Sequence, residues 1–331
     1  MSSTAAPVPP SFDKTFGVLF LASVLTTALW GACGVQLYFY YDTFSKTDRW
    51  WLKIYVFIVY ALDTMHQTFI LASVYLYFVS GFSDVSNLNH IERPLVYIDI
   101  GAGFTDVPVQ ILFVMRIWRL GKKNYILTGV PAILVTAQFV LVLYLFGMIY
   151  GKTEITELVT CFKFMRGLNA VIFIADTTIA CVMIYLLHSV RSGIKQTDSL
   201  LNRLIIYTIS TGLTTSILAL VSVVVPLDTF INLACDLIIP KLYTNSMLAL
   251  LNSRQKLRDT ISDSFGCGIS INNNIRMHAV DANAARNDVF GTDIVIDIIK
   301  VDNERMSVSA SGGSGRSEAE EDVKHSHATS A

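Results

Sequence analysis

The feature that most constrains this chain is a series of seven long apolar stretches. They lie at about residues 16–41, 54–80, 95–115, 125–150, 167–188, 204–225 and 229–251. A helix needs about 20 apolar residues to cross the hydrocarbon core of a bilayer, and each stretch meets that length. The sequence therefore predicts an all-α fold, a polytopic membrane bundle of seven transmembrane helices.

The composition agrees with this assignment. Of 331 residues, 53% are hydrophobic and 15% are charged, whereas soluble domains carry nearer a quarter charged residues. No basic patch interleaved with aromatic residues suggests nucleic-acid binding. The lipid bilayer is thus the first predicted partner, and nucleic acid is excluded.

Lysine and arginine are concentrated in alternate loops, which predicts the orientation. One set of loops holds Lys46, Arg49, Lys53, Arg116, Arg119, Lys122, Lys123, Arg191, Lys195, Arg203, Arg254, Lys256 and Arg258. The opposite set holds only Lys14, Arg93, Lys152, Lys163 and Arg166. Because cytoplasmic loops carry the excess of positive charge, we expect the N-terminus to lie outside and the C-terminus to lie in the cytosol. The membrane that we expect to hold the protein is the plasma membrane.

The chain divides into four predicted regions. Residues 1–15 form a short external extension, and residues 16–251 form the transmembrane domain. Residues 252–267 predict a basic amphipathic helix along the inner leaflet. Residues 268–331 form a cytosolic tail, mostly disordered, because its Ser/Gly/acidic composition from Met306 onward cannot bury enough apolar surface to fold.

Two positions beyond the last apolar stretch are candidates for modification. Cys267 follows the basic helix and is either a palmitoylation site or an unmodified thiol. Ser317 precedes an acidic run, which suits an acid-directed kinase, although a merely solvated tail is the preferred interpretation.

Polar residues inside the apolar stretches fall on shared helical faces. The groups, by stretch, are Asp63, His66 and Gln67; Asp99, Gly103, Asp106 and Gln110; Asn169 and Asp176; and Asn232, Asp236 and Tyr243. Spacings of three, four and seven residues place side chains on one side of a helix.

Four of these carboxyl groups are predicted at a common depth. At about 1.5 Å of rise per residue, Asp63, Asp106, Asp176 and Asp236 all lie roughly 12–17 Å into a core about 30 Å thick. They cannot all be ionised side by side, so some are protonated or a cation is present. We predict a site for a small ligand or cation at these four residues and His66. The alternative is a set of neutral, hydrogen-bonded carboxyl groups that hold helices together.

Lys241 also stands within the last apolar stretch. It lies nearer the predicted cytosolic end, and a long lysine stem can carry its charge to the membrane edge. We therefore expect Lys241 to snorkel there.

Sequence signatures of enzymes are missing. The chain has no HExxH, GxSxG or P-loop motif and no histidine cluster, and its five cysteines lack zinc spacing. The prediction is a protein that is not an enzyme, with no cofactor and no metal centre.

Two segments near the end of the transmembrane domain carry a family resemblance. They are "KQTDSLLNRLIIYTISTGLTTS", residues 195–216, and "KLYTNSMLALLNSRQKLR", residues 241–258. They resemble the C-terminal signature of a large family of uncharacterised integral membrane proteins from mushroom-forming fungi, classed as a domain of unknown function. The resemblance covers about residues 163–258 and implies membrane location and fold, with no chemistry.

Signal reception is the predicted function class. A receptor-like protein would couple the central acidic site to a cytosolic partner through the basic loops and the tail. The alternative is a transporter of a small solute, protons or cations that uses the same carboxyl groups; no internal repeat of the kind many transporters show is evident.

Overall fold

The structure, a computed structural model, describes most of the predicted membrane domain. The described residues are 16–46, 48–81, 90–121, 123–154, 157, 159–189, 214–218, 220–222, 224–225 and 230–266. The long helices are α1 (Val18–Phe44), α2 (Trp50–Tyr75), α3 (Arg93–Leu120), α4 (Tyr125–Ile149), α5 (Val159–Ser189) and α7 (Ile231–Gly266). A π-helical turn, η2 (Leu76–Ser80), continues α2. In the part of the chain described, β structure is limited to one isolated bridge, between His90 and Glu154.

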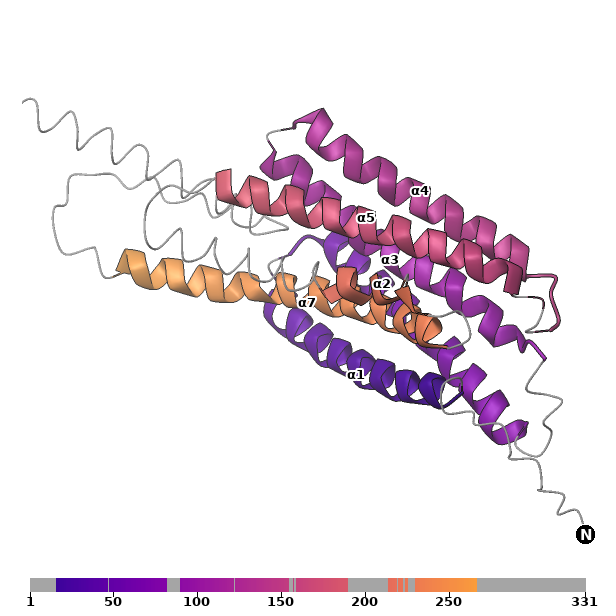
Figure 1. Ribbon diagram of the computed structural model, residues 1–331. Coiled ribbons are helices and arrows are strands. Elements are labelled where there is room, and N and C mark those ends of the chain that lie inside the picture. The colour runs from indigo at the N-terminus through magenta and orange to yellow at the C-terminus, as the bar shows by residue number, and fades with distance from the viewer. Residues whose placement is uncertain are drawn as a thin grey trace, which may run out of the picture.

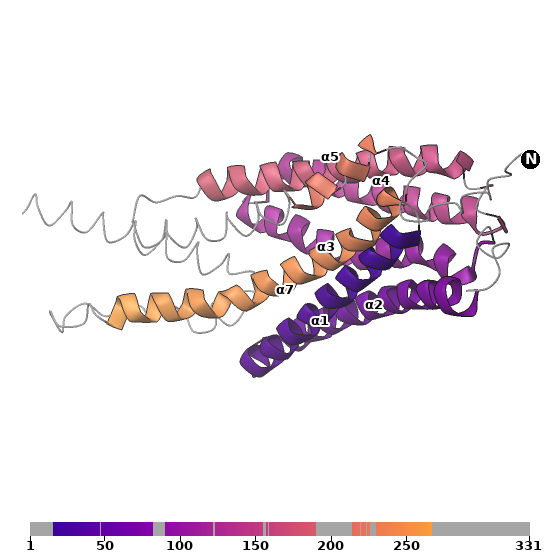
Figure 2. The same ribbon diagram turned by 60° about the horizontal axis from the view of Figure 1, so that its bottom comes forward.

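The helices form an elongated bundle in which neighbours in sequence are also neighbours in space (Figure 1). Each of the pairs α1–α2, α2–α3, α3–α4 and α4–α5 is in contact. α3 is central, since it also contacts α5 and α7, while α7 packs along α1 and touches α2 and α3. Figure 2 shows α7 passing between α1 and the layer that holds α5. Polar side chains of α3 and α7 therefore lie inside the bundle.

The distribution of polarity is the reverse of that in a soluble protein. Large apolar side chains face outward along the helices: Leu21 is 68% exposed, Ile133 is 70% exposed and Tyr185 is 65% exposed. The polar side chains of Asp63, His66 and Lys241 are instead fully buried. Extensive apolar surface of this kind marks contact with a membrane rather than with water.

Within the part of the chain that the structure describes, five helices are long and apolar enough to cross a bilayer. They are Val18–Phe44, Trp50–Ser80, Arg93–Leu120, Tyr125–Ile149 and Lys163–Ser189. They match the first five predicted apolar stretches. The prediction of an all-α, multi-pass membrane protein is confirmed at this level.

The last two predicted stretches differ from the first five. Most of 204–225 lies outside the described residues. Of its described parts, 214–218, 220–222 and residue 224 are helical, and residue 225 is not. Residues 231–251 of the last stretch lie in α7, which continues without a break past residue 252 to Gly266. Asn232, Asp236 and Lys241 lower the mean hydropathy of α7, and a helix enclosed by other helices tolerates such residues because few of its side chains face lipid.

Candidate functional site

The predicted polar face of α2 points into the bundle. Asp63 and His66 are fully buried and Gln67 is 1% exposed, so the three share one protein-facing side, as their spacing predicts. Gln67 donates a hydrogen bond from Nε2 to the hydroxyl of Thr27 on α1 at 2.9 Å. Asp63 and His66 are thereby left facing α3 and α7.

Asp63 and Lys241 form an ion pair in the interior. Lys241 Nζ lies 2.7 Å from Asp63 Oδ1 and donates a second hydrogen bond to the backbone oxygen of Asp63 at 2.9 Å. Both side chains are 0% exposed. The expectation that Lys241 snorkels to the membrane edge is wrong: its ammonium group is paired across the bundle, which removes the need to reach water.

His66 lies one turn from Asp63 against the backbone of α3. A Cβ at Gly101 would lie 3.4 Å from His66 Cδ2 and 3.7 Å from its Cα, so the two helices approach closely here. Neither ring nitrogen of His66 has a hydrogen-bond partner, nor does Asp63 Oδ2. Buried polar atoms of this kind are commonly satisfied by an internal water or an ion.

A second polar cluster joins α3, α4, α5 and α7. The hydroxyl of Tyr243 donates to Asp176 Oδ1. Gln110 Nε2 donates to Gln138 Oε1 at 3.1 Å and to the Tyr243 hydroxyl at 3.4 Å. Thr215, from the described helical turn 214–218, also lies within hydrogen-bonding reach of Asp176. Asp176 is thus held by protein groups on several helices.

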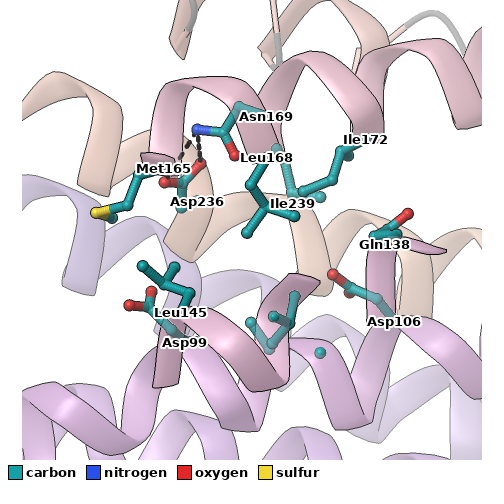
Figure 3. Close-up of a pocket in the computed structure, with 13 residues that line it drawn as sticks. Asp99, Asp106, Gln138, Leu145, Met165, Leu168, Asn169, Ile172, Asp236 and Ile239 are labelled. Carbon is teal, nitrogen blue, oxygen red and sulfur yellow. Dashed lines mark hydrogen bonds between the residues drawn. The ribbon is translucent and has the colours of Figure 1, made fainter. Parts of the chain in front are cut away.

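A third cluster joins α5, α7 and residues 220–222. Asn169 Nδ2 donates to both carboxyl oxygens of Asp236, at 3.1 and 3.3 Å, and to the hydroxyl of Ser222. Figure 3 shows the two bonds between Asn169 and Asp236 as dashed lines. One amide therefore fixes the direction of this carboxyl group.

A small cavity, which we call the central cavity, lies beside these clusters. Its polar lining is Asp99, Asp106, Gln138, Asn169 and Asp236, and its volume is about 40 Å³. Asp99 and Asp236 lie on one side of the view in Figure 3, while Asp106 and Gln138 lie on the other. A water needs about 10–15 Å³ measured in this way, so the cavity has room for a few waters or a small cation.

Asp106 is the carboxyl group that connects the predicted site residues. It is 5% exposed, it lines the central cavity, and its Oδ1 has no hydrogen-bond partner. It lies within electrostatic range of Asp63, Asp176 and Asp236, and of Lys241. The predicted acidic residues thus lie near one another, with three of them bound to separate protein partners and Asp106 between them.

Within the described ranges, no three His, Cys, Asp or Glu side chains are grouped as metal ligands would be. The carboxyl groups lining the central cavity instead face a shared space, across which water could bridge them.

Sequence reasoning missed three members of these clusters, which are Gln138, Thr215 and Ser222. Gln138 is a single polar amide within the apolar stretch 125–150, and that isolation is a signal that could have identified it. Ser222 stands in a stretch with many serines and threonines, so nothing in the sequence distinguished it.

Several predicted features lie outside the described residues. They include the extension 1–15, the modification candidates Cys267 and Ser317, and the tail 268–331.

One comparison with known proteins gives a match. Residues 172–256 match a family of unknown function, DUF6534. This supports the resemblance to an uncharacterised family at nearly the residues predicted for it. No curated protein and no solved structure matches the chain.

Proposed function

We propose that the chain is a seven-span, receptor-like plasma-membrane protein that binds a small cation or protons in the central cavity. Its N-terminus lies outside and its C-terminus in the cytosol, and it has no catalytic role. The excess of Lys and Arg in alternate loops supports the orientation. The seven apolar stretches support the number of spans.

The observation that carries the proposal is the position of α7. This single helix contributes Asp236 to the central cavity, Lys241 to the ion pair with Asp63, and Tyr243 to the hydrogen bond with Asp176. It is 36 residues long, or about 54 Å at 1.5 Å per residue, which exceeds the roughly 30 Å hydrocarbon core. A change of charge in the cavity therefore acts on a helix that extends well beyond it.

The chemistry of the central cavity supports a small positive ligand. Three carboxyl and two amide groups line it. Pockets for organic ligands usually enclose about 300–1,000 Å³, whereas this cavity holds about 40 Å³. A proton, a sodium ion or a hydronium ion fits that space.

Reception requires that the ligand favour one conformation over another. A cation near Asp106 would offset its repulsion with Asp63, Asp176 and Asp236, and would compete with Lys241 for Asp63. The interactions that hold α7 to the other helices therefore differ in strength between the ion-bound and the ion-free states. The basic loops and the cytosolic tail are the proposed contact surface for a partner.

The second candidate function is transport of the same ion. It is supported by the location of the central cavity between α3, α4, α5 and α7, because transporters bind their substrates between helices near the bilayer midplane.

Thermal unfolding of the purified chain tests the proposed binding. We expect the melting temperature to rise with sodium concentration, or to change between about pH 5 and about pH 8, because a ligand bound only by the folded state stabilises it by mass action. Asp106→Asn should reduce this dependence, while Asp42→Asn, at an exposed position at the end of α1, should retain it. A wild-type protein insensitive to both sodium and pH would contradict the proposal.

Proteoliposomes separate the two candidate functions. With a pH-sensitive dye or labelled sodium inside the vesicles, ion-binding protein that produces no flux supports reception. Flux that Asp106→Asn abolishes assigns the protein to transport.

A further inference from the structure

A second cavity, which we call the basic pocket, opens at the end of the bundle where α3 begins and α4 ends. Its volume is about 270 Å³. His90, Arg93 and Lys152 contribute its charged or chargeable groups, and Tyr97 and Tyr150 contribute aromatic rings. No carboxyl group is among the described residues that line it.

Backbone hydrogen bonds join two separate loops at this pocket. Ile91 N donates to Thr153 O at 2.8 Å, beside the β-bridge between His90 and Glu154. The hydroxyl of Tyr77 donates to His90 O at 2.8 Å and accepts from Glu92 N at 3.1 Å. The backbone segment 90–92, which lies beside the basic side chains, is therefore hydrogen-bonded both to the second loop and to Tyr77.

Tyr97 and Tyr150 contribute the aromatic wall of the basic pocket, and further rings of α2 and α4 pack against them. Tyr97 of α3 contacts Phe69 of α2, with ring centroids 5.6 Å apart, and Phe146 of α4, at 6.2 Å. Phe146 in turn contacts Tyr150 at 5.5 Å. Tyrosines near helix ends are typical of the lipid headgroup level of a membrane protein.

The cationic groups of the pocket are available for a ligand. Arg93 is exposed and Lys152 is half-buried, and no described carboxylate forms a salt bridge with either. An arginine fork and a lysine ammonium together suit the several oxygens of a phosphate group.

We propose that the basic pocket binds a phosphate group, held by Arg93 and Lys152 against the wall formed by Tyr97 and Tyr150. The phosphate belongs either to a lipid headgroup, whose level the pocket occupies at the helix ends, or to a soluble phosphate, which would reach the pocket from the outer side in the proposed orientation. This site is separate from the central cavity, and no residue lines both.

The test is a titration of the purified full chain in a neutral detergent, followed by thermal unfolding. The probes are dioctanoyl phosphatidic acid, dioctanoyl phosphatidylcholine and inorganic phosphate. We expect phosphatidic acid to raise the melting temperature saturably and phosphatidylcholine to leave it unchanged. An Arg93→Gln/Lys152→Gln double variant should require at least about tenfold more phosphatidic acid, because it lacks two hydrogen bonds to a charged group.

Lys163→Gln is the matched control. Lys163 is an exposed lysine on α5 near the same end of the bundle and does not line the pocket, so this variant should titrate like wild type. The single variant Lys152→Gln gives an intermediate shift and guards against misfolding of the double variant. If inorganic phosphate raises the melting temperature and the double variant loses this effect, the site binds soluble phosphate. If phosphatidic acid alone raises the melting temperature, the site binds a lipid headgroup. Equal effects of the two lipids, no effect of any probe, or wild-type behaviour of the double variant would overturn the proposal.

Discussion

The ion pair between Asp63 and Lys241 places two opposite charges where neither side chain is exposed. Removing both charges from water costs several kcal/mol per ion, and the pair offsets this cost only while both partners remain. The second hydrogen bond, from Lys241 to the backbone oxygen of Asp63, satisfies a further proton of the ammonium group. The pair thus makes α2 and α7 dependent on each other.

A double-mutant cycle should reveal this dependence. We expect Asp63→Leu or Lys241→Met alone to lower the free energy of unfolding by about 3–5 kcal/mol, because each leaves an uncompensated buried charge. The combined variant should be more stable than either single variant. Unfolding of the four proteins in detergent measures the coupling, with Lys163→Met, at an exposed position, as the control. If the losses in free energy of unfolding from the two single substitutions simply add in the double variant, the two side chains have no coupling energy.

At the residue scale, the sequence predicted which face of a helix is buried better than it predicted which residue each buried side chain contacts. The spacing of Asp63, His66 and Gln67 correctly placed all three on a buried side of α2. The position of Lys241 in its own stretch suggested a route to the membrane edge, whereas its partner lies 178 residues away in sequence. Helical periodicity contains no information about which helix packs opposite a given face.

At the scale of elements, the contact between α3 and α4 depends on a glycine. A Cβ at Gly103 would lie 2.8 Å from Val142 Cγ1, and Val142 is a stiff, β-branched side chain that is 6% exposed. Gly103 also lines the central cavity. The helices can approach this closely because position 103 carries no side chain.

Gly103→Ala should therefore destabilise the protein by about 1–3 kcal/mol through overpacking. Gly147→Ala is the matched control on α4, since a Cβ there has no atom within 4 Å, and it should change stability by no more than about 0.5 kcal/mol. Adding Val142→Ala to Gly103→Ala should restore part of the loss by removing the clashing methyl group. Equal melting temperatures for Gly103→Ala and Gly147→Ala would argue against the close contact.

The elements themselves were largely predictable, because length and hydropathy alone identify a helix that faces lipid. The first five apolar stretches correspond to helices that are long and apolar enough to cross a bilayer. A helix over residues 252–267 was predicted, but as a separate element along the inner leaflet. That α7 continues unbroken through this region to Gly266 was not predicted, since the change from apolar to basic residues near 252 resembled a boundary. Composition indicates where a helix leaves the membrane, and the backbone can remain helical beyond that point.

At the scale of the whole molecule, the proposed seven spans place the two ends of the chain on opposite sides of the membrane. An epitope ahead of residue 7 should be accessible on intact cells, and a reporter fused after Ala331 should be protected until the membrane is permeabilised. An odd number of spans requires this asymmetry. Finding both ends on the same side would exclude seven spans.

The unbroken course of α7 gives it the mechanical character of a lever. Pro240 lies within it, between Asp236 and Lys241, and a proline removes one backbone hydrogen bond where it stands. The helix between Pro240 and Gly266 is about 39 Å long, so a tilt of about 5° at Pro240 moves its far end by about 3 Å. Figures 1 and 2 show that this end extends beyond the other described helices. If the proposed receptor function is correct, a sub-ångström rearrangement beside the proline would be magnified into a displacement that a docked protein could detect.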